Sequence, residues 1–339
     1  MSDQWLRKLY LVVHNDQEGV DLSDLRVTFS VRNASEESPN TLEARIYNLS
    51  DVTLAKVVGA RDIGVGGSVK NGIWTPSASL QASNGEFSKV TLNAGYEHGA
   101  FGIIFTGQIK QYRIGRESQT TTYLDILAAD GDFLYNSFGS GSYEKGTSVK
   151  DIVEDLVKKA RPDGPAPEFK LDQDPQHIVT PRGVVVFGMN RAYIRGIAST
   201  LDAIWSIQDG VVSIVGKNRI EDSSVVEINV QTGLVGIPEQ TADGIRFRCL
   251  LNSNLRIGGM VVINNKDVNQ LVQAGVGSAP TMYSQWAGIY ANAFMNPDGK
   301  YMLFSVEHEG DTRGQPWYSI CTALSVSPTS AGTDEVIAT

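Results

Sequence analysis

Short segments in which apolar and polar residues alternate recur along most of this 339-residue chain. Alternation with a period of two predicts β-strands that bury one face. Several short strands separated by turns are typical of a β-sandwich or β-barrel. We expect such strands at residues 9–13, 27–31, 42–49, 89–96, 102–107, 108–113 and 121–129, and again at 226–230, 244–251, 260–263, 300–306 and 317–324.

The middle of the chain follows a helical pattern instead. Apolar residues between Val149 and Val157 recur at the spacing of an amphipathic helix, Ser148 can cap its start, and Pro162 lies just beyond its end. A second helix is expected at about 191–204, capped by Asn190.

A β-hairpin is predicted directly after that helix. Asp209-Gly210 separates the apolar runs 203–207 and 211–215, and Asp-Gly between such runs is a strong signal for a tight turn. Residues 140–220 therefore predict a small α/β domain. A short helix at 51–58, capped by Ser50 or Asp51, is expected within the first β region.

These segments predict a mainly β fold with an α/β insert, in which two antiparallel β-barrels are separated in sequence by the small domain. Residues 302–324 repeat the strand, turn, strand order of 103–129, an order that either a true duplication or two independent small β-barrels would produce. The predicted domains are a first β-barrel at 1–138 with a long glycine-rich loop at 59–88, the α/β insert at 139–222, a second β-barrel at 223–325 and a flexible C-terminal tail at 326–339.

The charge of the chain argues against a tight complex with nucleic acid. The formal net charge is -9 and no long block of Lys or Arg occurs, whereas binding to phosphate backbones depends on cationic contacts. DNA that slides past without being held is compatible with this charge. The start of the sequence lacks a signal-peptide pattern, and no apolar run approaches the ~20 residues that span a bilayer. We expect a protein made and kept in the cytoplasm, unless a particle carries it out.

The two cysteines, Cys249 and Cys321, both lie in apolar strand-like runs. They could form a disulfide, but two reduced and buried thiols are favoured for a chain made in the cytoplasm.

Few residue patterns in this chain suggest catalysis or metal binding. The histidines follow no zinc-binding spacing, and no nucleophile-elbow or phosphate-loop motif is present. The densest group of ionisable residues, 307–311, could be an acid/base or metal loop, but we favour a solvated hairpin turn because neighbouring strand residues point to opposite faces. Asp130-Gly131-Asp132 is interpreted as a strand-end turn rather than a calcium loop, and 139–142 as a flexible joint. We therefore predict no catalytic, cofactor-binding or metal-binding residues, no cofactor and no enzymatic activity.

Several segments resemble the baseplate hub proteins of contractile-tailed bacteriophages, the tube-type two-barrel hub family. The resemblance is carried by Ile46-Tyr47-Asn48-Leu49-Ser50, by Phe105-Thr106-Gly107-Gln108-Ile109, and by further segments in the same order at 5–8, 19–25, 39–42, 94–96, 125–132, 233–238, 250–252 and 308–314. Each segment is short, and the resemblance rests on the order in which the segments follow one another along the chain.

This resemblance implies a role as well as an architecture. Such hubs form homotrimers in which six barrels make a ring that joins a hexameric tail tube to a trimeric tail spike and leaves a channel for DNA. The resemblance also allows contacts with a tape-measure protein and with baseplate wedge proteins. It implies a place in the virion, at the tail baseplate, after assembly in the host cytoplasm, without insertion into a membrane. From the net charge we expect an acidic channel lining that repels DNA.

Three alternatives stay open at this point. The nearest is another tail-tip structural protein, such as a tube or distal-tail component. A cell-wall hydrolase of the tail tip is the second. The third is a receptor- or carbohydrate-binding module that displays Trp74, Trp286 and Tyr290 on one surface, although packing inside the protein or between subunits is the favoured explanation of such aromatics.

Overall fold

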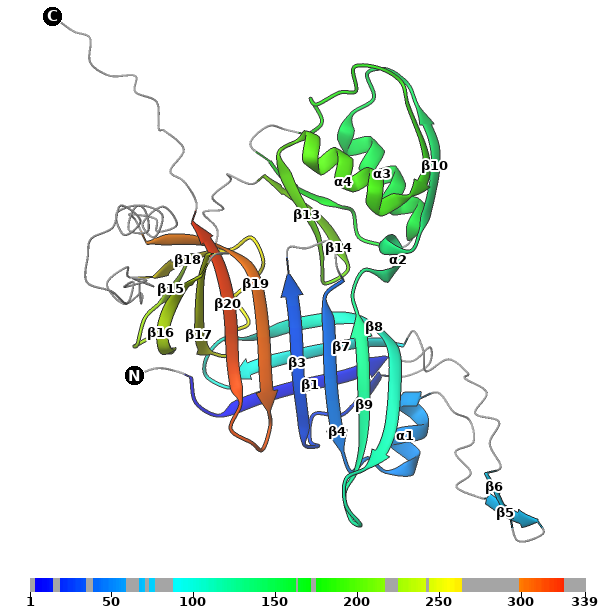
Figure 1. Ribbon diagram of the computed structural model, residues 1–339, viewed down its shortest axis with the longest axis vertical. Coiled ribbons are helices and arrows are strands. Elements are labelled where there is room, and N and C mark those ends of the chain that lie inside the picture. The colour runs from blue at the N-terminus through cyan, green and yellow to red at the C-terminus, as the bar shows by residue number, and fades with distance from the viewer. Residues whose placement is uncertain are drawn as a thin grey trace, which may run out of the picture.

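A large β-sheet forms the body of the protein, and a smaller α/β unit stands at one end of it (Figure 1). The computed structural model describes residues 4–14, 19–34, 39–58, 67–70, 73–76, 88–162, 164–171, 175–216, 225–241, 244–263 and 299–325. The predicted tail at 326–339, Trp286, Tyr290 and most of the predicted loop at 59–88 lie outside these residues. Of that loop, β5 (Gly67–Lys70) and β6 (Ile73–Pro76) form an antiparallel pair.

The first β half consists of two layers that cross at a steep angle (Figure 1). A large apolar core lies between them, and its centre includes Leu11, Leu92 and Leu124, which are fully buried. Helix α1 (Asp51–Val58) begins where the sequence predicts, because the Ser50 hydroxyl accepts a hydrogen bond from the Thr53 N–H at 3.1 Å. The strands are β1 (Arg7–His14), β2 (Gly19–Asp21), β3 (Val27–Ala34), β4 (Thr41–Tyr47), β7 (Lys89–Tyr96), β8 (Phe101–Arg116) and β9 (Thr122–Ala129).

Strand β8 runs through both layers of this half. Its first part pairs with β7 and its second part with β9, and a bulge between Ile109 and Gln111 marks the change. A Cβ atom on Gly107 would lie 2.7 Å from the carbonyl oxygen of Ala129, so the bend requires glycine there. The sequence predicted two strands, 102–107 and 108–113, where the protein has one long bent strand. The error has a physical cause: a bulge interrupts the alternation without ending the strand.

The second β half continues the same sheet. Its strand β19 pairs with β3 of the first half through seven residue pairs, from Ser305–Ala34 to Asp311–Thr28. The two β regions are thus separated in sequence and joined in space, in the strand order β16-β17-β20-β19-β3-β4-β9-β8. The strands of this half are β15 (Val226–Ile228), β16 (Leu234–Thr241), β17 (Gly244–Leu250), β18 (Met260–Ile263), β19 (Lys300–Asp311) and β20 (Trp317–Ser325).

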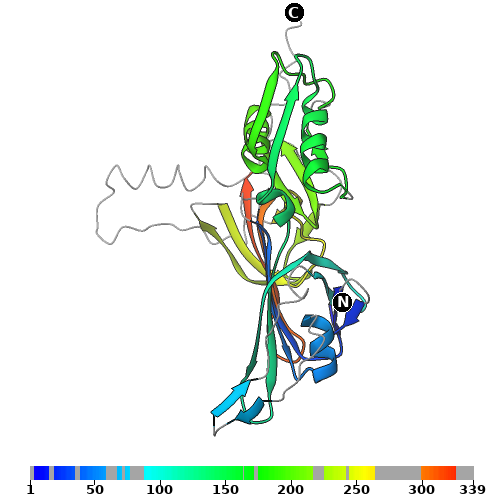
Figure 2. The same cartoon turned by 90° about the vertical axis from the view of Figure 1, so that its right-hand side faces the viewer.

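The insert stands beyond the ends of the body strands and extends the long axis of the molecule (Figure 2). Helix α3 buries Ile152, Val153, Leu156 and Val157, which are part of the apolar face that the sequence predicts, and Ser148 caps it. The predicted hairpin is confirmed as well, with positive φ angles at Asp209 and Gly210 in its turn. The elements are α2 (Asp132–Tyr135), β10 (Phe138–Tyr143), α3 (Val149–Ala160), β11 (Glu168–Lys170), β12 (Val184–Met189), α4 (Asn190–Thr200), β13 (Ala203–Gln208) and β14 (Val211–Gly216).

Two sequence predictions in the insert are wrong. Residues 139–142 belong to strand β10, which pairs with β12, rather than to a flexible joint. Helix α4 ends at Thr200 instead of 204, and Asn190 is its first residue rather than its cap. The Asn190 amide donates instead to the Ser137 hydroxyl at 2.7 Å, so a tertiary contact takes the side chain that the local pattern assigned to capping.

The mainly β fold class with an α/β insert is confirmed. The exact domain limits stay a prediction. The predicted boundary at 138/139 falls inside β10, and Leu134 and Tyr135 of α2 already pack with the helices of the insert.

Candidate assembly surfaces

Strand β16 and the second part of β8 each leave one side of the continuous sheet open, although the strand path runs on from the first part of β8 through β7 and β1 to β2. Within the described residues, β16 is hydrogen-bonded to β17 alone, and the second part of β8, from Gln111 to Arg116, is paired with β9 alone. An open edge presents unpaired N–H and C=O groups to any strand that can add to it.

The β8 edge displays an apolar residue that the chain itself leaves half uncovered. Ile114 lies opposite Leu124, which is fully buried, and so it is on the core-facing side of the sheet. Its side chain is nevertheless 46% exposed, because no described strand lies beyond it. A neighbouring element would bury it.

The β16 edge is irregular. Its pairing with β17 shifts between Val235 and Glu239, Gly236 has a φ of 80°, and Pro238 has no N–H to donate. Ile237 in this bulge is 67% exposed. A proline and a bulge make it harder for an arbitrary strand to pair with this edge. A specific neighbouring strand can still pair with the regular part of β16, outside the bulge.

The solvent-exposed face of the sheet carries balanced charge. Cross-strand neighbours place Arg45 beside Asp125, with 2.6 Å between Nε and Oδ1, and Arg32 beside Glu307 at 3.5 Å. Among the described residues, the strand pairings put both signs of charge on this face: Arg32, Arg45, Arg113, Arg246, Arg248 and Lys300 with Glu43, Asp125, Glu227, Glu239, Glu307, Glu309 and Asp311. Arg26, which precedes β3, binds Asp311 and brings the positive groups to the same number as the carboxylates. This face is therefore not predominantly acidic, and the acidic channel lining stays a prediction.

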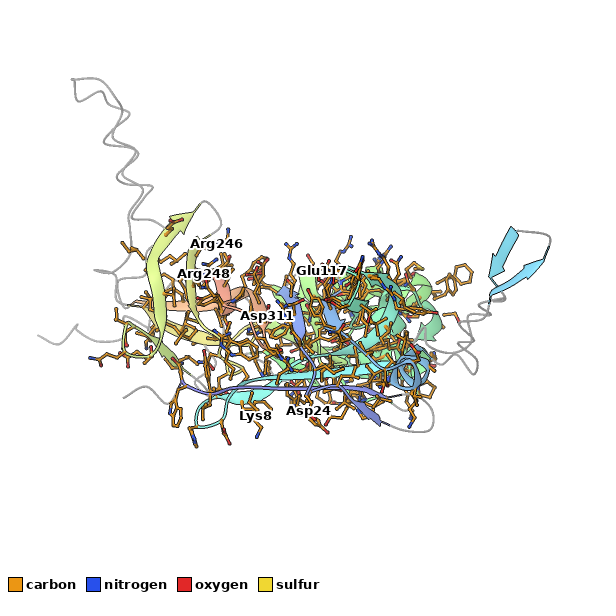
Figure 3. The ribbon with its side chains drawn as sticks, turned by 90° about the horizontal axis from the view of Figure 1, so that it is seen from below. Lys8, Asp24, Glu117, Arg246, Arg248 and Asp311 are labelled. Atoms are coloured by element: carbon orange, nitrogen blue, oxygen red, sulfur yellow. The ribbon has the colours of Figure 1, made fainter. Side chains whose placement is uncertain are left out.

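The same face is concave over the first half. A hollow of about 550 Å³ lies over β3, β4, β9 and the second part of β8, and its lining includes Glu43, Arg45, Arg113 and Asp125. Arg246 and Arg248 lie on one side of the layered body, and Lys8 and Asp24 lie on the opposite side (Figure 3). The concave, charge-balanced face and the outer layer with β1 are thus two distinct surfaces.

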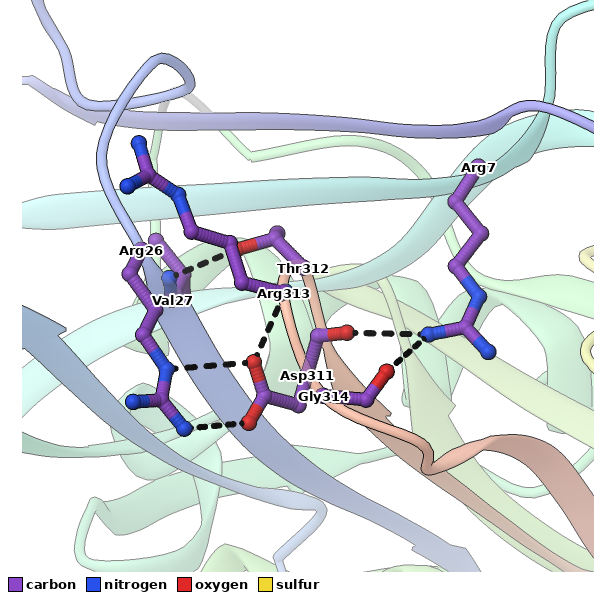
Figure 4. A network of polar contacts seen from close by, with 7 residues as sticks. All are labelled: Arg7, Arg26, Val27, Asp311, Thr312, Arg313 and Gly314. Carbon is purple, nitrogen blue, oxygen red and sulfur yellow. Dashed lines mark hydrogen bonds and ion pairs between the residues drawn. The ribbon is translucent and has the colours of Figure 1, made fainter.

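A polar network ties the two β halves together at the ends of β3 and β19 (Figure 4). Arg26 binds Asp311, with Nη2 2.8 Å from Oδ2, and the Arg313 N–H donates to the same carboxylate at 2.9 Å. Arg7 of β1 donates to the carbonyl oxygens of Asp311 and Gly314 at 3.2 and 2.5 Å. Burial raises the pKa of Asp311, but the Arg26 guanidinium and the Arg313 N–H outweigh it and hold that pKa below its usual value.

The ionisable cluster at 307–311 is not the solvated turn that the sequence predicted. These residues are the last part of β19, and the turn follows at 312–316. Glu307 and Glu309 lie on the exposed face, whereas His308 is buried, with Nδ1 2.8 Å from the Ser319 hydroxyl. Burial lowers the pKa of His308 to about 4, so the ring is neutral near pH 7. Neighbouring residues of this segment do point to opposite faces of the sheet, as the sequence predicts. The strand, however, continues to Asp311 instead of ending at residue 306.

Asp130 directly follows β9, in the strand-end turn that the sequence predicts, and connects the body to the insert. Burial raises the pKa of its carboxyl to about 6, although the Gly210 N–H donates to Oδ2 at 3.0 Å and opposes the shift. Asn40 makes a second link, because its amide donates to the Ile207 carbonyl at 2.8 Å. A crevice of about 280 Å³ lies at this junction, and both Asp130 and His308 contribute to its lining.

Cys249 and Cys321 are both buried free thiols. They lie on the neighbouring strands β17 and β20, offset by two residues in register. Burial raises the pKa of Cys321 well above its usual value, and the adjacent Cys249 raises it further. A protonated, enclosed thiol is a poor nucleophile.

The described residues contain no group of three or more His, Cys, Asp or Glu side chains placed to hold a metal ion. No helix in the described ranges has the length and apolar character needed to cross a bilayer.

Sequence reasoning missed several of these features. The Arg26–Asp311 pair joins residues far apart in the chain, and no local pattern signals it. The β10–β12 ribbon was missed because glycine and serine dominate β10, yet Val-Val-Val-Phe at 184–187 was an available strand signal. Trp74 lies in β6, where only the backbone is described.

The sequence matches a known protein family. A protein-family model described as baseplate hub gp41 matches residues 73–273, which is more than half of the chain. No curated protein sequence matches the chain.

Solved structures share the fold over nearly the whole chain. A tail protein from Neisseria meningitidis MC58 superposes with a TM-score of 0.56 and 9% identity, covering 95% of this chain and 97% of that one. The 43 kDa tail protein of prophage MuSo2 from Shewanella oneidensis gives a TM-score of 0.54 and 7% identity, with coverages of 93% and 96%.

A third similar structure is the E. coli c3393 protein. It is described as a type VI secretion component that resembles the T4 tail proteins gp27 and gp5. It superposes with a TM-score of 0.51 and 12% identity, covering 94% of this chain and 77% of that one. With its family model matched over more than half its length and its fold shared with tail proteins, this chain belongs to the baseplate hub gp41 family and is a structural component of a phage or phage-like tail.

Proposed function

We propose that this protein is the non-catalytic central hub of a contractile-tail baseplate, where three copies form a ring between the hexameric tail tube and the trimeric tail spike. The observation that carries the proposal is the single sheet with two unlike open edges, β16 and the second part of β8. In the proposed ring β8 of one chain lies beside β16 of the next, so that both open edges are paired. Such a contact either closes into a ring or continues as a filament.

The arrangement of the two halves supports three copies. Strands β7, β8, β9 and β4 follow one another in the first half as β18, β19, β20 and β17 do in the second. The hairpins β8–β9 and β19–β20 each contain a bulge in their first strand, between Ile109 and Gln111 and between Leu303 and Ser305. Three chains would therefore present six similar units, which matches a six-fold tube.

In this ring the concave, charge-balanced face would line the channel. Arginines paired with carboxylates offer DNA few unpaired cations, and a neutral lining also avoids the repulsion that an acidic one would cause. DNA would pass without being held. The particle would be the virion, with assembly in the host cytoplasm.

The test is the oligomeric state of the purified chain. Light scattering coupled to size exclusion should give three times the 36.8 kDa of one chain, alone or when the tail tube protein is added. Ile114→Asp and Ile237→Asp, one at each edge, should each abolish the trimer, because each places a charge where the neighbouring chain would cover an apolar side chain.

Val52→Asp on α1 is the matched control, since Val52 is 70% exposed and belongs to neither edge strand. It should leave the trimer intact. A wild-type chain that stays monomeric in the presence of the tube protein, or edge variants that trimerise normally, would count against the ring.

A further inference from the structure

The outer face of the β10–β12 ribbon is an exposed apolar surface at the far side of the insert. The register pairs Phe138 with Met189 and Ser140 with Phe187, so alternate residues of the two strands share this face. The opposite face packs on the helices, where Val186 contacts the cluster of Ile152 and Leu156. The ribbon thus uses one face to hold the insert together and leaves the other free.

The free face is aromatic and uncharged. Phe138 is 57% exposed and Phe187 is 74% exposed, and their rings meet edge to face with 4.9 Å between centroids. Val185 beside them is 70% exposed. The residues that the register places on this face include no ionisable side chain: Phe138, Ser140, Ser142, Val185, Phe187 and Met189. A partner that complements this surface is itself apolar and uncharged at the contact.

The size of the face limits what can cover it. From the usual areas of such side chains, the exposed parts of Phe138, Val185 and Phe187 amount to roughly 350 Å². Apolar patches of a few hundred Å² on soluble proteins mark interaction sites. When one such patch binds a partner, the two proteins together bury roughly 700 Å² of accessible surface, which is below the ~1,000 Å² of a specific interface. Three patches together bury roughly 2,000 Å², which is the size of a stable interface. A partner that engages three ribbons at once is therefore favoured over one ribbon paired with one other chain.

The position of the insert supplies three ribbons on one side. A ring closed through β8 and β16 has its strands running along its axis, and the insert lies beyond the strand ends, so the inserts project from one end of the ring (Figures 1 and 2). Each chain has two similar β halves but one insert. The end without inserts presents six similar units, and the end with them presents three.

We propose that the β10–β12 outer faces of three chains together bind the three-fold symmetric spike component, at the end of the ring opposite the hexameric tube. This inference rests on the ring proposed above and assigns its two ends. The contact is apolar, and it is centred on Phe138 and Phe187.

The test uses the full-length chain, the trimeric spike protein and the tube protein of the same tail, with light scattering first to establish the trimer. Phe138→Ser with Phe187→Ser should leave the trimer and its binding to the tube protein unchanged and weaken binding to the spike at least tenfold. The hydrogen bond from the Phe187 N–H to the Tyr193 hydroxyl involves only the Phe187 backbone, so the ribbon should keep its fold. Val185→Ser is a milder second variant on the same face, and Val52→Ser on α1 is the matched control.

The outcomes of this experiment distinguish the proposed ring from the proposed spike-binding surface. Spike binding within twofold of wild type in both ribbon variants, or loss of tube binding in place of spike binding, would overturn the assignment while the ring remains. A wild-type chain that forms no trimer would overturn the ring and this inference together. Weaker spike binding in the Val52→Ser control to the same extent would show that the effect is not specific to the ribbon and would also overturn the assignment.

Discussion

Arg26 and Asp311 form an ion pair across the junction of the two β halves, with 2.8 Å between Nη2 and Oδ2. Arg26 immediately precedes β3, and Asp311 ends β19, so the pair lies where the two halves of the sheet begin to separate. The same carboxylate accepts a hydrogen bond from the Arg313 N–H. One side chain thus fixes both the neighbouring strand and the turn that follows β19.

Asp311→Asn should lower the free energy of unfolding by about 1–2 kcal/mol at pH 7, since it removes the charge from a pair whose carboxylate is largely buried. The pKa of Asp311 is lower in the folded than in the unfolded chain. Its stabilisation is therefore complete above the unfolded pKa of about 4 and disappears as the pH falls through the folded pKa. Urea unfolding at several pH values measures this.

The control for that experiment is Glu307→Gln. The Arg32–Glu307 pair is longer, at 3.5 Å, and the Arg32 side chain is 62% exposed. Its loss should change stability by less than ~0.5 kcal/mol. Equal losses in the two variants would contradict the role assigned to Asp311.

Asp130→Asn should stabilise the protein at neutral and alkaline pH. The folded-state pKa of Asp130 is raised to about 6, so the folded chain holds this proton more tightly than the unfolded chain does. Stability from this group is present at low pH and is lost as the pH rises through about 6. Asparagine has no proton to lose and can still accept from the Gly210 N–H, so the gain should reach on the order of 2 kcal/mol above pH 7. A gain that is the same at pH 4 and pH 8 would rule out this explanation.

Gly310→Ala should destabilise the protein by about 1–3 kcal/mol. A Cβ atom at this position would overlap the ring of Phe29 and lie 2.8 Å from Cε3 of Trp317, two rings that pack edge to face in the core. The same change at Gly196 in helix α4, where no atom lies within 4 Å of the added carbon, should stabilise by about 0.5–1 kcal/mol. Thermal unfolding of the two variants, compared with wild type, should give shifts of opposite sign.

The two thiols should resist modification in the folded protein. Cys249 and Cys321 are each 1% exposed, and burial keeps the pKa of Cys321 high, so the reactive thiolate is scarce. A thiol-specific chromogenic reagent should react only after denaturant is added, and both thiols should then titrate. Absence of any free thiol after denaturation without reductant would mean that the two cysteines form a disulfide.

Local patterns in the sequence determined most of the elements. Strands β7 and β18 have the predicted ends, and Ser50 and Ser148 cap α1 and α3 as expected, because alternation, helical periodicity and capping act over a few neighbouring residues. The order of the motifs also led to the correct family. These features depend on which residues follow one another, and no distant contact is needed to recognise them.

The tertiary structure alone decided how the elements combine. Whether 102–113 is one strand or two depends on β9 and β7 lying beside it, and Asn190 lost its capping role to a contact with Ser137. The joining of β3 to β19, the burial of His308 and the balanced charge of the exposed face all arise from pairing between residues far apart in the chain. A net charge says how many ionised groups a chain has, but only the register of its strands says which face they occupy.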